Sequence, residues 1–270
     1  MKLMYITNNP DAARIAEQAG VDRIFVDLEV IGKAERQGGM DTVQSNHTIE
    51  DIRVMRRLLT KSELLVRVNQ IHPGSEAEIR EVIDAGADIL MLPYFKTPQQ
   101  VADFLRFAGG RVRTMLLVET PEAVACIDEI LAMDGIDECY VGLNDLHLGY
   151  KQKFLFEPLT DGTTEALCKK FRAAGKPYGF GGIAKPDRGL VPANRIIGEH
   201  VRLGSSCVIL SRSFCNPITI TDPAEIREIF EREVPRVRAI KAQWQKSSAE
   251  ELEANRREIA AIVDRIKEKM

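Results

Sequence analysis

Residues 89–124 read ILMLPYFKTPQQVADFLRFAGGRVRTMLLVETPEAV, and this stretch decides the fold class. It contains an apolar run at Ile89–Tyr94, then a segment of helical periodicity that Gly109 follows, then a second apolar run at Thr114–Glu119. Two short apolar runs joined by a helix are typical of two parallel strands with a helical crossover. The stretch therefore predicts a strand–helix–strand unit.

The same alternation extends over most of the 270 residues. Thr48-x-x-Asp51 is a capping signature at a helix start, and Pro10 and Pro121 stand where a first helical turn begins. Eight such repeats predict an α/β fold, a (β/α)8 TIM barrel with additional C-terminal helices, whose main competitor is a doubly wound open sheet. Residues 1–215 are expected to form the barrel core. The other six strand runs are Leu3–Thr7, Arg23–Glu29, Leu64–Asn69, Cys139–Asn144, Tyr178–Ile183 and Cys207–Ser211.

Residues 216–270 are expected to form a closing helix and a helical extension of the same domain. Their last segment, Ala249–Lys269, carries an apolar stripe at Leu252, Ile259, Val263, Ile266 and Met270. Two interpretations are open for this stripe. The helix folds back on the bottom of its own barrel, or it packs against a neighbouring subunit, which would make the protein a homo-oligomer.

The composition of the chain limits the classes of molecule that the protein is expected to bind. Lys and Arg number 37 and Asp and Glu 40, for a net charge of −3, so no basic excess points to nucleic acid or an anionic membrane. No stretch reaches the roughly 20 apolar residues of a membrane span, and the first residues lack the pattern of a signal peptide. The five cysteines form neither a CxxC pair nor a zinc spacing. We expect a cytoplasmic protein with reduced thiols that acts on small molecules.

Charged side chains follow several predicted strands at their carboxyl ends, where barrels of this class build active sites. Strand two ends with Asp27 and Glu29, strand three with Arg67, strand five with Glu119, and strand six is followed by Asp145. Two carboxylates from adjacent strands, completed by water and a chelating substrate, suit Mg²⁺ or Mn²⁺. The alternative is that each carboxylate caps a helix or pairs with a basic residue.

Several motifs, in this order, carry a resemblance to a known family. They are VDLE (26–29), LVRVN (65–69), GADILMLP (86–93), VETPEAV (118–124) and GLNDLHLG (142–149). The chain resembles the HpcH/HpaI aldolase and citrate lyase β-subunit family, part of the phosphoenolpyruvate/pyruvate superfamily. The resemblance covers roughly residues 3 to 215.

The resemblance implies a metal-dependent carbon–carbon lyase that acts next to a 2-keto acid or an acyl-CoA. Glu119 and Asp145 would bind the divalent metal, Mg²⁺, Mn²⁺ or Co²⁺. Arg67 would bind the keto and carboxylate oxygens of the substrate, and the turn at Leu143, Asn144 and Asp145 would hold its carboxylate. The implied reaction cleaves or forms a 4-hydroxy-2-oxo or 2-keto-3-deoxy acid through a pyruvate enolate, with an aldehyde as the second reactant.

The chain departs from the aldolase pattern at two positions. Val30 stands where that branch has its base histidine after the acidic pair Asp27 and Glu29, and Leu117 stands where it tends to have Gln. The base is therefore unassigned among His47, His147 and a metal-bound hydroxide. His47 ends a long loop from Val30 that has the length of a lid.

Rival functions remain at this stage. The missing histidine favours a citrate-lyase-like acyl-CoA lyase, or a catalytically degenerate barrel kept for interactions. Glycines at Gly179–Ile183 and Gly204–Ser206 would suit a phosphosugar enzyme. No lysine lies inside a strand run, which argues against Schiff-base chemistry. Lys96 and Lys185 follow strands four and seven, where they could meet an anionic substrate.

Overall fold

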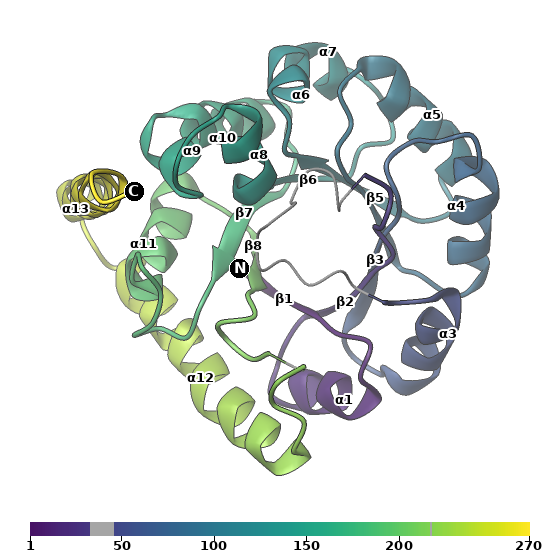
Figure 1. Cartoon of the computed structure of the whole chain (residues 1–270), viewed down its shortest axis with the longest axis horizontal. Helices are drawn as coiled ribbons and strands as arrows, with labels where there is room; N and C mark the ends of the chain where they lie inside the picture. The colour runs from purple at the N-terminus through teal and green to yellow at the C-terminus, as the bar shows by residue number, and fades with distance from the viewer. Residues whose placement is uncertain (33–45, 217) are drawn as a thin grey trace.

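The chain folds as a closed barrel of eight parallel strands (Figure 1). The computed structural model describes residues 1–32, 46–216 and 218–270. Each strand pairs with the next along the chain, and β8 pairs with β1, which confirms the TIM barrel over the open sheet. The strands are β1 (Lys2–Ile6), β2 (Arg23–Asp27), β3 (Glu63–Arg67), β4 (Ile89–Leu92), β5 (Arg113–Val118), β6 (Glu138–Val141), β7 (Tyr178–Ile183) and β8 (Cys207–Leu210).

Helices surround the barrel and begin and end at the signals read in the sequence. Thr48 forms a full capping box with Asp51, Pro10 and Pro121 open their helices, and Gly109 ends its helix with a φ of 59°. The helices are α1 (Pro10–Gln18), α3 (Ile49–Leu58), α4 (Ser75–Asp84), α5 (Pro98–Ala108), α6 (Pro121–Ala125), α7 (Ile127–Leu131), α8 (Leu143–Gly149), α9 (Glu157–Thr160), α10 (Thr163–Ala173), α11 (Ala193–Leu203), α12 (Pro223–Trp244) and α13 (Ala249–Lys267).

The two C-terminal helices pack on the outer ring of helices. α12 lies against α1 and α11, and α13 lies against α11 and α9, at the edge of the molecule in Figure 1. Ile259 and Val263 of the apolar stripe are buried, whereas Met270 is exposed. The middle of the stripe is thus covered by its own chain, on the side of the barrel and not on its bottom, whereas Leu252 and Ile266 are half-buried. Assembly through these helices stays a prediction.

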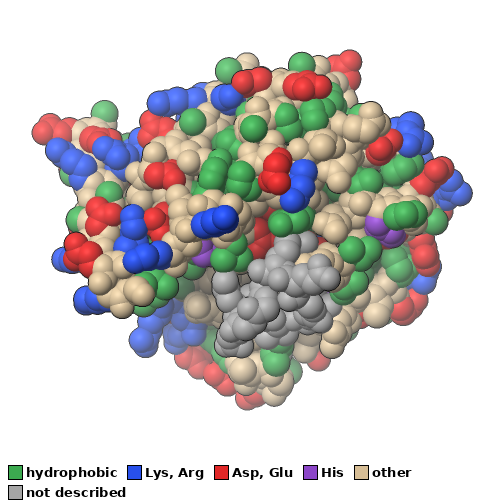
Figure 2. Space-filling model, turned by 45° about the horizontal axis from the view of Figure 1, so that its top comes forward, with side chains coloured by type: hydrophobic (Ala, Val, Ile, Leu, Met, Phe, Trp, Pro, Cys, Tyr) green, Lys and Arg blue, Asp and Glu red, His purple; other side chains and the backbone are tan. Residues whose placement is uncertain are grey.

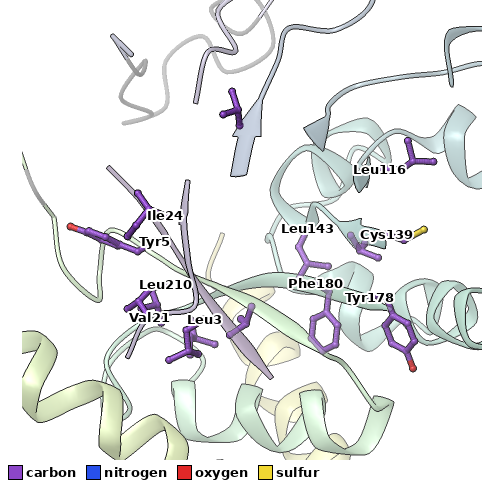
Figure 3. Packing of buried hydrophobic residues seen from close by; sticks show 14 of the residues in the cluster. Leu3, Tyr5, Val21, Ile24, Leu116, Cys139, Leu143, Tyr178, Phe180 and Leu210 are labelled. Carbon is purple, nitrogen blue, oxygen red and sulfur yellow. The ribbon is translucent and has the colours of Figure 1, made fainter. Parts of the chain in front are cut away.

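Strand residues alternate between two hydrophobic layers. One set faces the helices and includes Leu3, Ile24, Leu116 and Leu210, several of which Figure 3 shows packed between strands and helices. The other set fills the barrel interior as a separate cluster. Its buried members are Met4, Phe25, Leu65, Ile89, Met91, Met115, Leu117, Tyr140 and Cys207.

An ionic layer closes the amino-terminal end of the interior. Arg23 is fully buried and donates to both carboxylate oxygens of Glu138, at 2.8 and 2.6 Å, and to Glu63 at 2.8 Å. Glu63 also pairs with Lys2 and Arg113. Burial alone would raise the pKa of Glu63, but these three cations outweigh it and lower the pKa to about 2.

The surface carries mixed charge. Figure 2 shows blue basic and red acidic side chains interspersed over the face in view, without a large field of one sign. No helix of the described residues is both long and apolar enough to span a membrane.

Candidate active site

The top layer of the barrel interior is charged, because the inward strand positions change from apolar to ionic at the carboxyl ends. Asp27 follows inward-facing Phe25 by two residues, Arg67 follows Leu65, and Glu119 follows Leu117. Side chains two residues apart on a strand point to the same face. All three charged side chains therefore belong to the interior above the apolar cluster.

On one side of this charged layer, Arg67 pairs with two carboxylates. Its Nε and Nη2 donate to the two carboxylate oxygens of Asp27, each at 2.8 Å, and its Nη1 lies 3.2 Å from Glu29. Burial alone would lower the pKa of Arg67, but the negative charges of Asp27, Glu29 and Glu119 raise it above its usual value. These contacts engage three of the five N–H groups of the guanidinium, so one N–H on Nη1 and one on Nη2 remain for a substrate oxygen.

Glu119 lies at the other side, between the ends of β4 and β6. Its Oε1 accepts the backbone N–H of Tyr94 at 3.0 Å. Its Oε2 lies against Gly142, where an added Cβ would be only 2.6 Å away. The glycine therefore leaves room for the carboxylate, which is 4 % exposed.

Asp145 lies in the first turn of α8, three residues beyond Gly142, and is 8 % exposed. The β5–β6 register pairs Val118 with Val141, so the residue after each strand end meets at one corner of the rim. Buried carboxylates such as those of Glu119 and Asp145 are hard oxygen donors of the kind that Mg²⁺ and Mn²⁺ prefer. The chemistry of these two carboxylates thus fits a divalent metal.

The metal, if bound here, has few protein ligands. Within residues 1–32, 46–216 and 218–270, no group of three or more His, Cys, Asp or Glu side chains is arranged to hold an ion. Glu119 and Asp145 would leave the remaining positions to water and substrate, which is typical of Mg²⁺ sites.

The turn after β6 presents backbone N–H groups, more than side chains, to the barrel mouth. Leu143 is buried at 1 % exposure, with its Cδ1 against Gly181, so its side chain does not reach a substrate. Asn144 is half-buried and its Nδ2 donates to Asp145 at 3.2 Å. Both residues open α8, where the first N–H groups have no partner inside the helix.

The two candidate histidines differ in environment. His47 lies at the end of β2, where its Nδ1 accepts the backbone N–H of Asp27 at 2.9 Å. His147 is 5 % exposed in α8, and its buried Nδ1 makes no hydrogen bond with any described residue. The structure therefore brings His47, and not His147, into contact with the acidic pair's strand.

Two further predictions from the sequence concern a lid and a phosphate site. The predicted lid between Val30 and His47 falls mainly on residues 33–45, which lie outside the described residues. The phosphate site predicted from Gly204–Ser206 is wrong: these residues precede β8 at the amino-terminal end of the barrel. Their amides are also engaged, Ser205 with the carbonyl of His200 and Ser206 with that of Tyr178.

Two residues of the site escaped the sequence reading. Tyr94 has a φ of 47°, rare for a residue other than glycine, and this turns its N–H toward Glu119. Gly142 could have been found, because it stands at the inward position two residues after Tyr140, where a side chain would be expected. The sequence gives no indication of the positive φ of Tyr94 other than the proline that precedes it, Pro93.

A comparison with protein-family models matches residues 2–184 to the HpcH/HpaI aldolase/citrate lyase model. The chain belongs to this family. Among curated proteins, this chain is similar to a hydroxypyruvate/pyruvate aldolase of Agrobacterium fabrum. The two are 27% identical over 62% of this chain and 69% of the relative. A 2-keto-3-deoxy-L-rhamnonate aldolase of Shigella sonnei is 30% identical over 42% of this chain and 54% of the relative.

The similarity to curated relatives is partial. This HpcH/HpaI family member matches only 63% of the length of a hydroxypyruvate/pyruvate aldolase of Sagittula stellata, at 25% identity over 48% of its own length. Among solved structures, an HpcH/HpaI aldolase from Desulfitobacterium hafniense aligns with a TM-score of 0.63 at 20% identity, over 78% of this chain and 85% of that one. At that identity the structural likeness supports the fold alone.

Proposed function

We propose that this protein is a divalent-metal-dependent carbon–carbon lyase that cleaves or forms a 2-keto acid through the enolate of pyruvate, with an aldehyde as the other reactant. The observation that carries the proposal is the charged layer at the barrel mouth. Arg67 pairs there with Asp27 and Glu29, and the negative charge of Glu119 also raises the pKa of Arg67. Aldolase names among the relatives support the same reaction class.

The metal would be held by Glu119 and Asp145. When bound, a divalent cation supplies Lewis acidity, which stabilises negative charge on an oxygen of the keto acid. The protein's part is to fix the two carboxylates. The Tyr94 N–H holds one oxygen of Glu119, and Gly142 leaves room for the other.

Arg67 would bind the keto acid and add a fixed positive charge beside its enolate oxygen. A guanidinium fork oriented by two carboxylates costs little reorganisation when the charge on the substrate develops. Asp27 and Glu29 thus act as orienting groups for Arg67. The opening N–H groups of α8 at Leu143, Asn144 and Asp145 would hold the carboxylate of the keto acid.

His47 is better suited to donate a hydrogen bond than to remove a proton. A backbone N–H can only donate, so Nδ1 of His47 must be the acceptor in its contact with Asp27. The neutral ring then carries its hydrogen on Nε2, the remaining nitrogen. A neutral imidazole in this tautomer can polarise a carbonyl oxygen. The contact therefore favours a donor role for His47 over the base role.

Exchange of pyruvate protons tests the proposal without knowledge of the aldehyde. Pyruvate in D2O is followed by proton NMR with the full-length protein and Mg²⁺, and with excess chelator as the reference. We expect loss of the methyl signal only when Mg²⁺ is present. A catalytically degenerate barrel would leave the signal unchanged in both samples, and the proposal would then be wrong.

Substitutions assign the residues. Glu119→Gln, Asp145→Asn and Arg67→Ala should each abolish the exchange. Glu119→Gln and Asp145→Asn should also weaken Mg²⁺ binding in calorimetry, whereas Arg67→Ala should spare it. Glu122→Gln is the matched control, because Glu122 is half exposed and pairs with Lys96 outside the barrel interior. Full exchange in a Glu119→Gln/Asp145→Asn double variant would refute the metal site.

A further inference from the structure

A cavity of about 400 Å³ lies between the segment after β7 and the middle of α12, and every residue that lines it is charged. Four are cations and two are anions, so the lining has two positive charges in excess. The six residues are Lys185, Asp187, Arg188, Arg232, Glu233 and Arg236. We call this cavity the cationic pocket.

A buried carboxylate orients the two arginines of the pocket. Glu233 is 3 % exposed and accepts from Nε of Arg232 at 2.9 Å and from Nη1 of Arg236 at 2.8 Å. Asp187 takes the other end of the Arg236 guanidinium. Arg232 also donates to Glu228 at 2.8 Å, so each guanidinium is oriented by two carboxylates before any ligand arrives, which lowers the ordering cost of binding.

The other two cations are not used by the protein's own ion pairs. Among the described residues, no salt bridge involves Lys185 or Arg188. Lys185 follows the end of β7 by two residues and is half-buried, whereas Arg188 is exposed. Two unpaired cations beside two oriented guanidiniums leave a local charge that an anion would neutralise.

The helix α12 also lacks one backbone hydrogen-bond donor at this place. Pro235 lies between Glu233 and Arg236 inside the helix and lacks the N–H that would bond the preceding turn. Departures from local helix preference tend to occur at functional sites. This position adds a second reason to look for a ligand here.

We infer that the cationic pocket binds a phosphate group. Arginine forks match phosphate oxygens in pairs, and lysine supplies a compact charge to the same group. The volume suits a small anion, and the segment after β7, which carries Lys185 and Arg188, is one of those where barrels of this class commonly hold phosphate. The sequence also predicts that Lys185, just after strand seven, could meet an anionic substrate. The phosphate belongs either to the aldehyde substrate or to a free phosphate ligand.

Direct binding tests the site independently of catalysis. Inorganic phosphate is titrated into the full-length protein by calorimetry, in metal-free buffer so that Glu119 and Asp145 cannot recruit it through a cation. Ionic strength is kept low and matched with chloride, because an open site is screened by salt. We expect saturable binding that a Lys185→Gln/Arg188→Gln double variant weakens at least about tenfold.

Lys246→Gln is the matched control, because it removes an exposed cation near the end of the same helix, outside the pocket. It should bind phosphate as the unmodified protein does. Absence of binding in the unmodified protein, or equal binding in the double variant, overturns the inference. This holds whether or not pyruvate protons exchange, so the site and the proposed function fail separately.

The two sources of the phosphate are distinguished by kinetics, an arm that rests on the proposed function. The ratio of kcat/KM for glyceraldehyde 3-phosphate to that for glyceraldehyde is compared between the unmodified protein and the Lys185→Gln/Arg188→Gln variant. A fall of at least tenfold assigns the pocket to the substrate's phosphate. An unchanged ratio together with lost phosphate binding assigns it to a free phosphate ligand.

Discussion

Replacing Gly142 with alanine tests how the Glu119 carboxylate is held. Gly142 has a φ of −84°, which alanine adopts without strain, so the substitution adds one methyl group and nothing else. That carbon would lie 2.6 Å from Oε2 of Glu119, 2.8 Å from its Cβ and 3.1 Å from Cδ1 of Leu117. Non-bonded atoms are most stable at roughly 3.5–4.0 Å, so the side chain of Glu119 must move.

The cost follows from the crowding. Overpacking by a methylene typically destabilises by about 1–3 kcal/mol. If Glu119 relieves the strain by leaving its position, the same free energy appears as a loss of Mg²⁺ affinity, roughly 5- to 150-fold. We expect a folded Gly142→Ala protein that binds Mg²⁺ at least about fivefold more weakly and exchanges pyruvate protons correspondingly slowly.

The assay pairs calorimetric Mg²⁺ titration with urea denaturation of the same samples. Gly182→Ala is the control, because its added Cβ would meet its nearest atoms at 3.6 Å, an ordinary contact, on an unstrained backbone. It should leave Mg²⁺ affinity unchanged. A folded Gly142→Ala protein with full Mg²⁺ affinity would refute the assignment of Glu119 as a ligand held at this place.

Three other predictions concern the ionic layer and His47. Arg23→Met should lower the free energy of unfolding in urea by about 3–5 kcal/mol, because, among the described residues, the buried Glu138 keeps only Arg113, 3.8 Å away, as a cation. The double variant Arg23→Met/Glu138→Leu should recover most of that loss. The exposed-pair control Arg14→Met should cost less than about 1 kcal/mol. The folded pKa of Glu63, about 2, lies below its usual 4.5, so its stabilisation is complete above about pH 4.5 and is lost as the pH falls toward 2. An acid titration of the urea midpoint measures this, and a midpoint insensitive to pH between 5 and 2 would contradict it. His47→Gln, whose amide can replace Nε2–H, should retain more pyruvate exchange than His47→Ala; equal rates in the two variants would exclude the donor role.

Because side chains alternate between the two faces of a strand, many of the charged residues at the barrel mouth could be predicted from the sequence. Asp27 and Glu29 stand two positions apart at a strand end, which predicts that they share a face, and both contact Arg67. This works because a strand's alternation is set by local geometry, so neighbours along the chain are sufficient to assign a side. The strand run was nevertheless too long at Ile89–Tyr94, since β4 ends at Leu92 and Pro93 has no N–H for the ladder.

Long-range contacts could not be read in the same way. The cationic pocket joins Lys185 to Arg232 and Arg236, which lie on a different element more than forty positions away. Nothing in either segment specifies that packing. The apolar stripe of α13 posed the same difficulty, because its pattern showed that a cover was needed but not that α11 and α9 supply it.

The apolar cluster between the lower ionic layer and the mouth separates two groups of charges. Arg23 and Glu138 stabilise one end of the barrel, and the residues that would meet a substrate lie at the other. If the proposed reaction holds, substitutions among the loops above the rim would alter which acceptor is taken without disturbing the pair that stabilises the base. For protein engineering, this division recommends this chain as a scaffold on which acceptor specificity can be varied while the lower half of the barrel is left unchanged.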